Sequence, residues 1–156
     1  LGFHYAARHE SNIVGIAFME AVTKPLGWDD AGFTERILFK RLRDEEKGHK
    51  MIAENNFFIE TFLYKFGTNR KMTEEEKAYY AAPYPTVASR KPVETWPKEI
   101  PFDGKGSANY DEIYAYSQWL EASTVPKLLL YAKPGMILKK DVVAQIQQDF
   151  KALESV

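Results

Sequence analysis

A chain of 156 residues with 45% hydrophobic and 14% aromatic residues can bury the core of one ordinary domain, so we expect a globular protein. Its 21 lysines and arginines nearly balance its 22 aspartates and glutamates, and the net charge of -1 provides no long-range attraction for nucleic acid or an anionic membrane. The absence of cysteine excludes disulfides and thiolate metal sites within these residues and is compatible with a cytoplasmic location, and no apolar run approaches the ~18 residues of a membrane span.

The first twenty residues predict a helix, a turn and a buried strand. Leu1, Tyr5 and Ala6 recur at helical spacing, residues 9–12 (HESN) suit a turn, and residues 13–19 form a mostly apolar run. A helix followed by a strand is half of a βαβ crossover, and the other half is a strand that would have to come before it. We therefore expect this sequence to be an internal segment of a larger fold.

Glu20 stands where that apolar run ends. In an open α/β sheet the ligand crevice lies at the carboxyl ends of the strands, so a carboxylate at this point is a candidate catalytic group. A glutamate that caps a helix or lies in an exposed loop is the more ordinary outcome for a single residue. Position alone leaves both interpretations open.

Residues 23–106 are expected to form a layer of short helices without strands. Thr73 and Glu76 make a capping box, and Pro92 suits the first turn of another helix. Because each proline pushes its predecessor out of helical conformation, residues 96–101 (WPKEIP) are expected to be extended and turn-rich. Residues 104–106 (GKG) predict a hinge-like boundary.

Residues 107–156 predict a helix, a strand and a second helix. Asn109 with Glu112 suggests the N-terminal cap of the first helix, and residues 127–132 (KLLLYA) are typical of a strand covered on both faces. Apolar residues at helical spacing then predict a closing amphipathic helix; they are Val142, Val143, Ile146, Phe150 and Leu153. A further strand is expected to begin where the sequence stops.

The sequence contains no recognisable nucleophile, since it has no G-x-S-x-G motif and no cysteine. We expect structural or solvated roles for His4, His9 and His49. The pair Glu45 and His49 has the spacing of two metal ligands on a helix, but no third ligand is evident, so no metal is expected. A group of phenylalanines either forms helical core or lines an apolar cavity; they are Phe39, Phe57, Phe58, Phe62 and Phe66.

Six segments, in order, carry a resemblance to a known family: residues 1–5 (LGFHY), 15–20 (GIAFME), 28–29 (WD), 54–60 (ENNFFIE), 96–101 (WPKEIP), and 125–129 (VPKLL) with 134–135 (PG). Across essentially its whole length the chain resembles the haloalkane dehalogenases. The resemblance implies part of an α/β-hydrolase fold, with parallel strands and flanking helices, plus a helical cap. Residues 1–22 and 107–156 would belong to the hydrolase core and residues 23–106 to the cap.

The resemblance also implies a catalytic triad of which only one member lies in this sequence. The nucleophilic aspartate and the base histidine of the family fall outside it. In one branch of the family the acid follows the strand that ends in Met-Glu, which assigns that role to Glu20. The other branch places an aspartate after the strand at 127–132, where this chain has Lys133, Pro134 and Gly135.

The implied reaction is hydrolysis of a carbon–halogen bond through an aspartyl alkyl-enzyme ester, with a small halogenated hydrocarbon, water and halide as partners, no cofactor, and a monomer or weak homodimer. By position, the resemblance assigns seven residues to the apolar pocket: Phe39, Leu42, Phe58, Pro97, Ile100, Met136 and Ile137. Family members often have a second tryptophan where this chain has Ala31. The 156 residues alone are expected to be inactive.

Two alternatives use the same scaffold. Coelenterazine-oxidising luciferases, which are cofactor-independent oxygenases, look like these dehalogenases and share the ENNFF run. The other alternative is a catalytically silent hydrolase-like protein. Halide release, light emission or neither would discriminate among the three.

Overall fold

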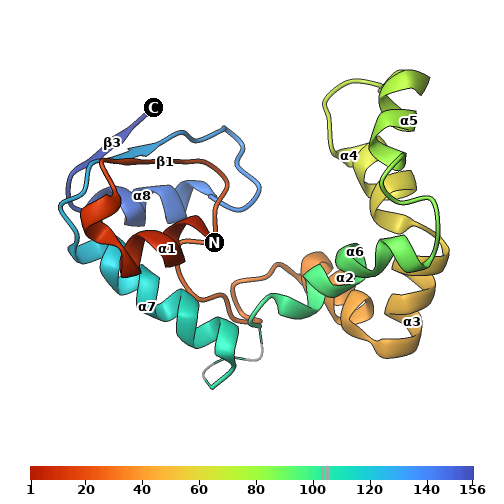
Figure 1. Cartoon of the computed structure of the whole chain (residues 1–156), viewed down its shortest axis with the longest axis horizontal. Coiled ribbons are helices and arrows are strands. Elements are labelled where there is room, and N and C mark those ends of the chain that lie inside the picture. Colours follow the sequence, from red (N-terminus) through yellow and green to blue (C-terminus); the bar gives the residue numbers. More distant parts are fainter. Residues whose placement is uncertain (103, 105) are drawn as a thin grey trace. The chain divides into compact units, whose positions relative to one another are not determined.

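A computed structural model describes residues 1–102, 104 and 106–156, and within it the chain forms two compact units (Figure 1). The first, called the core unit here, comprises Leu1–Gly27 and Pro101–Val156. The second, called the helical unit, comprises Trp28–Ile100. The hinge-like boundary predicted at 104–106 includes Lys105, which lies outside the described residues.

The core unit contains a parallel sheet of three strands in the order β1 (Ile16–Phe18), β2 (Lys127–Leu129) and β3 (Leu153–Ser155). Lys127 lies opposite Ile16 on one side and Leu153 on the other. The predicted α/β class with parallel strands is therefore confirmed. The strands are shorter than the apolar runs at 13–19 and 127–132, although the amide of Leu130 still donates to the carbonyl of Phe18 beyond the strand ends.

The closing helix is shorter than predicted, because Leu153 belongs to a strand. Helix α8 (Lys140–Asp149) ends where Phe150 turns to extended conformation, and Ala152 then adopts a positive φ of 49°. Phe150 and Leu153 both pack against the apolar cluster of the core unit. The helical spacing that included Leu153 was thus produced by two successive elements that face the same core.

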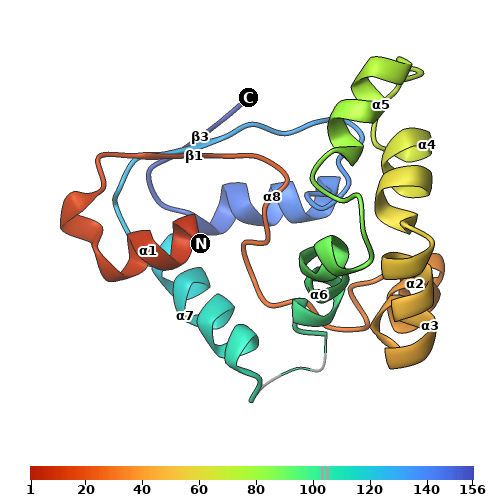
Figure 2. The ribbon, with the colours of Figure 1, turned by 45° about the vertical axis from the view of Figure 1, so that its right-hand side comes forward.

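Helices α1 (Gly2–Arg8) and α8 lie on the same side of the strands, as Figures 1 and 2 both show. The buried cluster beneath the sheet consists of Phe18, Leu129, Leu138, Val143 and Ile146. The short helix η1 (Glu10–Asn12) follows α1, and α7 (Ala108–Ala122) packs along α1. Ser107, not Asn109, caps α7, because its hydroxyl accepts a hydrogen bond from the amide of Tyr110 at 3.2 Å and the helix begins earlier than predicted.

The helical unit consists of eight short helices, and none of its residues, all of which are described, is in a strand. The helices are α2 (Phe33–Arg43), α3 (Glu45–His49), η2 (Lys50–Glu54), η3 (Phe57–Leu63), α4 (Tyr64–Phe66), α5 (Glu74–Ala81), η4 (Ala88–Arg90) and α6 (Lys91–Glu99). The predicted capping box is confirmed: the Thr73 hydroxyl accepts from the amide of Glu76, and the Glu76 carboxylate accepts from the amide of Thr73 at 2.8 Å.

The prediction of an extended passage at 96–101 is wrong for residues 96–99. Helix α6 begins near Pro92 as expected but continues through Pro97 to Glu99. The guanidinium of Arg43 donates hydrogen bonds to three carbonyls at this end of α6, and this contact from another helix offsets the local effect of the proline.

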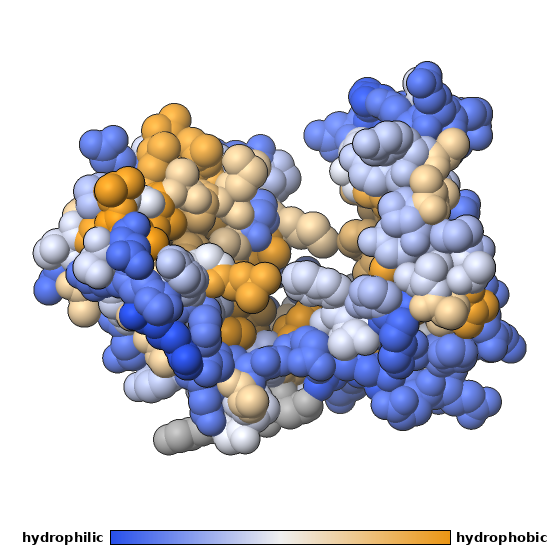
Figure 3. Space-filling model, viewed as in Figure 1, coloured by the Kyte–Doolittle hydropathy of each residue, from blue (hydrophilic) through white to orange (hydrophobic). Residues whose placement is uncertain are grey.

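The surface of the core unit includes apolar patches near its strands (Figure 3), and its exposed apolar side chains include Leu1, Val14 and Val156. The visible surface of the helical unit is more polar (Figure 3). Among the described residues, no helix has the length and apolar character needed to cross a membrane.

Candidate active site

Glu20 lies just beyond the carboxyl end of β1, two residues after Phe18. Its backbone has a φ of 42°, in the left-handed region that non-glycine residues seldom occupy. Such conformations persist only where the surroundings fix them, and they cluster at functional sites. The backbone at this position is therefore held in a specific, strained turn.

The two carboxylate oxygens of Glu20 have different surroundings. Oε2 accepts hydrogen bonds from the backbone amides of Met136 at 3.0 Å and Ile137 at 2.6 Å, in the loop after β2. Oε1 is buried and has no hydrogen-bond partner among the residues that the structure describes. A buried acceptor left unpaired costs about 1–3 kcal/mol. Glu20 is thus fixed through one oxygen, while the other remains available to a donor.

Gly135 lets the loop after β2 approach this carboxylate. A Cβ at position 135 would lie 2.2 Å from the carbonyl oxygen of Leu138 and 3.0 Å from Glu20 Oε1. The loop after β2 therefore comes close enough to supply amide donors for Glu20. Glu20 is partly exposed and is held by this loop, and its catalytic role stays a prediction.

Two of the predicted pocket residues, Met136 and Ile137, are the same residues whose amides hold Glu20. Their side chains are exposed, Met136 to 68% and Ile137 to 41%. The structure therefore places both next to the candidate catalytic group through their backbone. Their contact with a substrate stays a prediction.

The other five predicted pocket residues belong to the helical unit. Leu42 and Pro97 are buried inside it, whereas Phe39, Phe58 and Ile100 are partly exposed. Burial of Leu42 and Pro97 is what a role in the core of this unit requires, whereas the other three side chains are partly accessible from its surface. Their assignment to a pocket stays a prediction as well.

The phenylalanines of η3 and α4 contact one another ring to ring. Successive ring centroids lie 5.6 Å apart for Phe57 and Phe58, 5.9 Å for Phe58 and Phe62, and 6.2 Å for Phe62 and Phe66. These distances are those of favourable aromatic pairs. The cluster is therefore at least in part internal packing of the helical unit.

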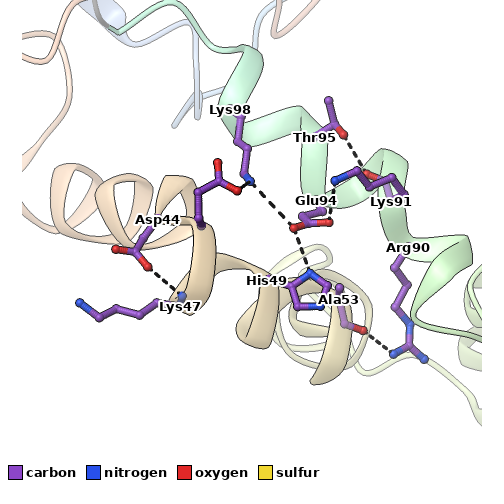
Figure 4. A network of polar contacts seen from close by, with 10 residues as sticks. Asp44, Lys47, His49, Ala53, Arg90, Lys91, Glu94, Thr95 and Lys98 are labelled. Atoms are coloured by element: carbon purple, nitrogen blue, oxygen red, sulfur yellow. Dashed lines mark hydrogen bonds and ion pairs between the residues drawn. The ribbon is translucent and has the colours of Figure 1, made fainter.

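His49 and Glu94 form the centre of a polar network between α3 and α6 (Figure 4). His49 Nδ1 lies 3.1 Å from Glu94 Oε1, and the Glu94 side chain is only 5% exposed. Lys91 Nζ lies 3.3 Å from the other oxygen. His49 therefore has a structural partner, as does His4, which pairs with Glu112. No group of three or more acidic or histidine side chains among the described residues is arranged to hold a metal ion.

The Glu94 network predicts acid sensitivity. Burial acts to raise the pKa of Glu94, but hydrogen bonds from His49 and Lys91 outweigh it and hold this pKa below its ordinary value. The contribution of the ionised Glu94 carboxylate to stability is therefore present above the unfolded-state pKa of glutamate, about 4.3. That contribution is lost as pH falls through the folded-state pKa of Glu94. Glu94→Gln should lower the free energy of unfolding at neutral pH by about 1–3 kcal/mol and flatten its decrease in acid.

Urea unfolding at several pH values checks this expectation. Glu75→Gln, at an exposed position on α5, is the matched control and should behave like the parent protein. If the free energy of unfolding of Glu94→Gln falls in acid as steeply as that of the parent protein, the network does not contribute to acid sensitivity.

This chain has parallel strands with flanking helices, an acid that follows one strand, and a helical segment inserted after that strand. It therefore forms part of an α/β-hydrolase fold. In sequence it is 35% identical over 147 residues to a haloalkane dehalogenase of Mycolicibacterium smegmatis, covering 94% of this chain and 47% of that protein. It is 37% identical over 136 residues to one from Sphingobium indicum, covering 86% and 45%. The resemblance predicted from sequence is thus confirmed, and the chain is homologous to haloalkane dehalogenases.

Solved structures agree with this relationship. Haloalkane dehalogenase DbeA from Bradyrhizobium elkani matches with a TM-score of 0.90 at 34% identity, covering 99% of this chain and 54% of the other. DatA from Agrobacterium tumefaciens matches with a TM-score of 0.86 at 27% identity, covering 99% and 53%. No family model matches the chain. The chain spans about half the length of the curated relatives it matches, and these relatives give no support to the luciferase alternative.

Proposed function

We propose that the protein containing this chain is a haloalkane dehalogenase, which converts a small haloalkane and water into an alcohol and halide. The observation that carries the proposal is the asymmetric environment of Glu20. One oxygen is held by two amides, and the other is buried beyond the carboxyl end of β1 without a partner among the described residues. That is the arrangement a triad acid needs in order to orient an imidazole.

In the proposed reaction, an aspartate carboxylate attacks the carbon that bears the halogen. A carbon–oxygen bond forms as the carbon–halogen bond breaks, and halide leaves with the bonding electrons. A histidine then takes a proton from water as the water oxygen bonds to the ester carbonyl carbon. The imidazolium returns a proton to the alcohol oxygen as its bond to that carbon breaks, and the aspartate is regenerated as a carboxylate with release of one proton to solvent. Both residues would come from polypeptide outside these 156 residues. No cofactor takes part.

Glu20 would act in the second step. Its Oε1 accepts a hydrogen bond from the histidine, fixes the tautomer whose other nitrogen faces the water, and stabilises the imidazolium that forms. The amides of Met136 and Ile137 keep the carboxylate from rotating away. Hydrogen bonds to a carboxylate are about twice as strong as neutral ones, so the two amides hold Glu20 firmly in one orientation.

The helical segment at 23–106 would serve as the cap domain, and residues 1–22 and 107–156 would belong to the hydrolase core. The residues proposed to bind the substrate are Phe39, Leu42, Phe58, Pro97, Ile100, Met136 and Ile137. Such apolar side chains suit a small hydrophobic substrate. We further propose a cytoplasmic enzyme that is a monomer or weak homodimer.

Halide release tests the proposal. The full gene product that contains this chain should release bromide from a terminal bromoalkane at many turnovers per molecule, measured by ion chromatography. Light emission with coelenterazine and no halide would contradict it in favour of an oxygenase. Neither product, from a folded protein, would identify a catalytically silent homologue.

A further inference from the structure

The last turn of α6 is helical against the preference of its own sequence. Pro97 has no amide hydrogen to donate to the carbonyl of Val93, and its ring disfavours helical conformation at Trp96. Nevertheless α6 continues to Glu99, and the chain becomes extended only at Ile100. A contact from outside the helix must therefore stabilise this turn.

Arg43, at the end of α2, supplies that contact. Its Nη1 donates to the carbonyl oxygens of Pro97 at 2.9 Å, Lys98 at 2.8 Å and Ile100 at 2.7 Å. The last carbonyls of a helix receive no hydrogen bond from an amide of the same helix, so an outside donor satisfies them. A cation at this end also complements the helix dipole. The half-buried guanidinium lies 5.8 Å from the ring centroid of Trp28 as well. Arg43 thus joins two helices and the first residue of the unit.

The amino-terminal part of α6 has separate anchors. Arg90 donates to the carbonyls of Tyr84 at 3.0 Å and Ala53 at 2.8 Å, and Glu94 pairs with His49. Loss of Arg43 should therefore loosen the last turn of α6 and leave its first turns in place. The affected turn carries Pro97 and Ile100.

We propose that Arg43 is a positioning residue for the substrate pocket, which sets substrate-size selectivity by holding the turn that bears Pro97 and Ile100. This inference rests on the proposed function, because the dehalogenase assignment places those two residues in the pocket. The three hydrogen bonds that Arg43 donates in this turn go to backbone carbonyls, so its role is to position the turn. Its effect should appear as selectivity between substrates, since one methylene of fit in an apolar pocket is worth about tenfold or more.

The experiment compares Arg43→Met and Arg43→Lys with Arg41→Met, an exposed position on the same helix, in the full gene product. The readout is the ratio of kcat/KM for a long and a short 1-bromoalkane. Arg43→Met should change this ratio about tenfold, mainly through KM, while the pH profile of kcat stays unchanged. Arg43→Lys should change it less, because an ammonium donates to carbonyls without the planar fork of arginine. Arg41→Met should leave it unchanged.

Amide hydrogen exchange provides a second measurement that does not depend on catalysis. Peptides that cover residues 98–102 should exchange faster in Arg43→Met than in the parent, and peptides that cover 91–95 should not. Unchanged selectivity and exchange in both Arg43 variants, with normal halide release, would overturn the role of Arg43 alone. A parent protein that releases no halide would overturn the proposed function and the selectivity role together, while the exchange experiment would still test whether Arg43 holds the turn.

Discussion

Glu20→Gln is expected to slow multiple-turnover halide release by about 10⁴-fold, the size of effect seen when a triad acid loses its charge. The geometry predicts how the glutamine sits. The amides of Met136 and Ile137 both point at the Oε2 position, so the carbonyl of the new amide must take that place. Its NH₂ group then occupies the Oε1 position and faces the imidazole as a donor. The histidine is left in the wrong tautomer for activating water.

The same variant should retain the first half of the reaction. Displacement of halide by aspartate does not require the histidine, so about one halide per enzyme molecule should appear rapidly. The alkyl ester should then accumulate and be visible by mass spectrometry of the intact protein. A purely structural role for Glu20 would reduce the rapid phase as well.

Glu154→Gln is the matched control, since Glu154 is an exposed carboxylate on β3 of the same sheet. It should show parental turnover and no trapped ester. Steady-state halide release by Glu20→Gln within a few-fold of the parent would remove the basis of the proposed function.

Local signals in the sequence were sufficient for the features that depend on neighbouring residues. The capping box at Thr73 and Glu76 satisfies two backbone amides within one turn, so its residue types identify it directly. Val143 and Ile146 are buried on one side of α8, as their helical spacing predicted. Glu20 follows a strand as predicted, although that strand spans only Ile16–Phe18 and, of the apolar run ahead of Glu20, only Phe18 is buried.

Features that depend on distant residues could not be predicted from these patterns. The amides that hold Glu20 lie 116 and 117 residues further along the chain. Arg43, which keeps α6 helical past Pro97, is 54 residues away from it. Leu153 pairs with Lys127 in the sheet, although its spacing matched a helix. In each case a tertiary contact outweighed the local preference that the sequence displays.

The candidate site also combines a feature that neighbouring residues predict with features that depend on distant residues. A carboxylate after an apolar run indicated where chemistry could occur. Nothing in the residue pattern indicated that one of its oxygens is held by two amides while the other has no partner among the described residues. The residue type at 135 carried a hint, since glycine permits a close approach of backbone. Only the structure shows that the approaching groups are Leu138 and the carboxylate itself.

Gly135→Ala should therefore damage both stability and activity. The added Cβ would lie 2.2 Å from the carbonyl oxygen of Leu138, a backbone atom that cannot rotate away as a side chain can. Overpacking of this kind costs about 1–3 kcal/mol of unfolding free energy. It would also lie 3.0 Å from Glu20 Oε1, so the loop and the carboxylate must move apart. A shift of ~1 Å at a catalytic group can cost about 100-fold in rate, and we expect a loss of turnover of about that size.

Gly15→Ala is the control for this substitution, because a Cβ there meets Pro126 at an ordinary distance of 3.5 Å. It should change the free energy of unfolding by less than about 1 kcal/mol and leave halide release intact. Urea unfolding and halide release measured on the same preparations separate the two effects. If Gly135→Ala is destabilised yet fully active, the loop supports the fold without positioning Glu20, whereas reduced turnover in a protein that remains folded links the loop to the carboxylate.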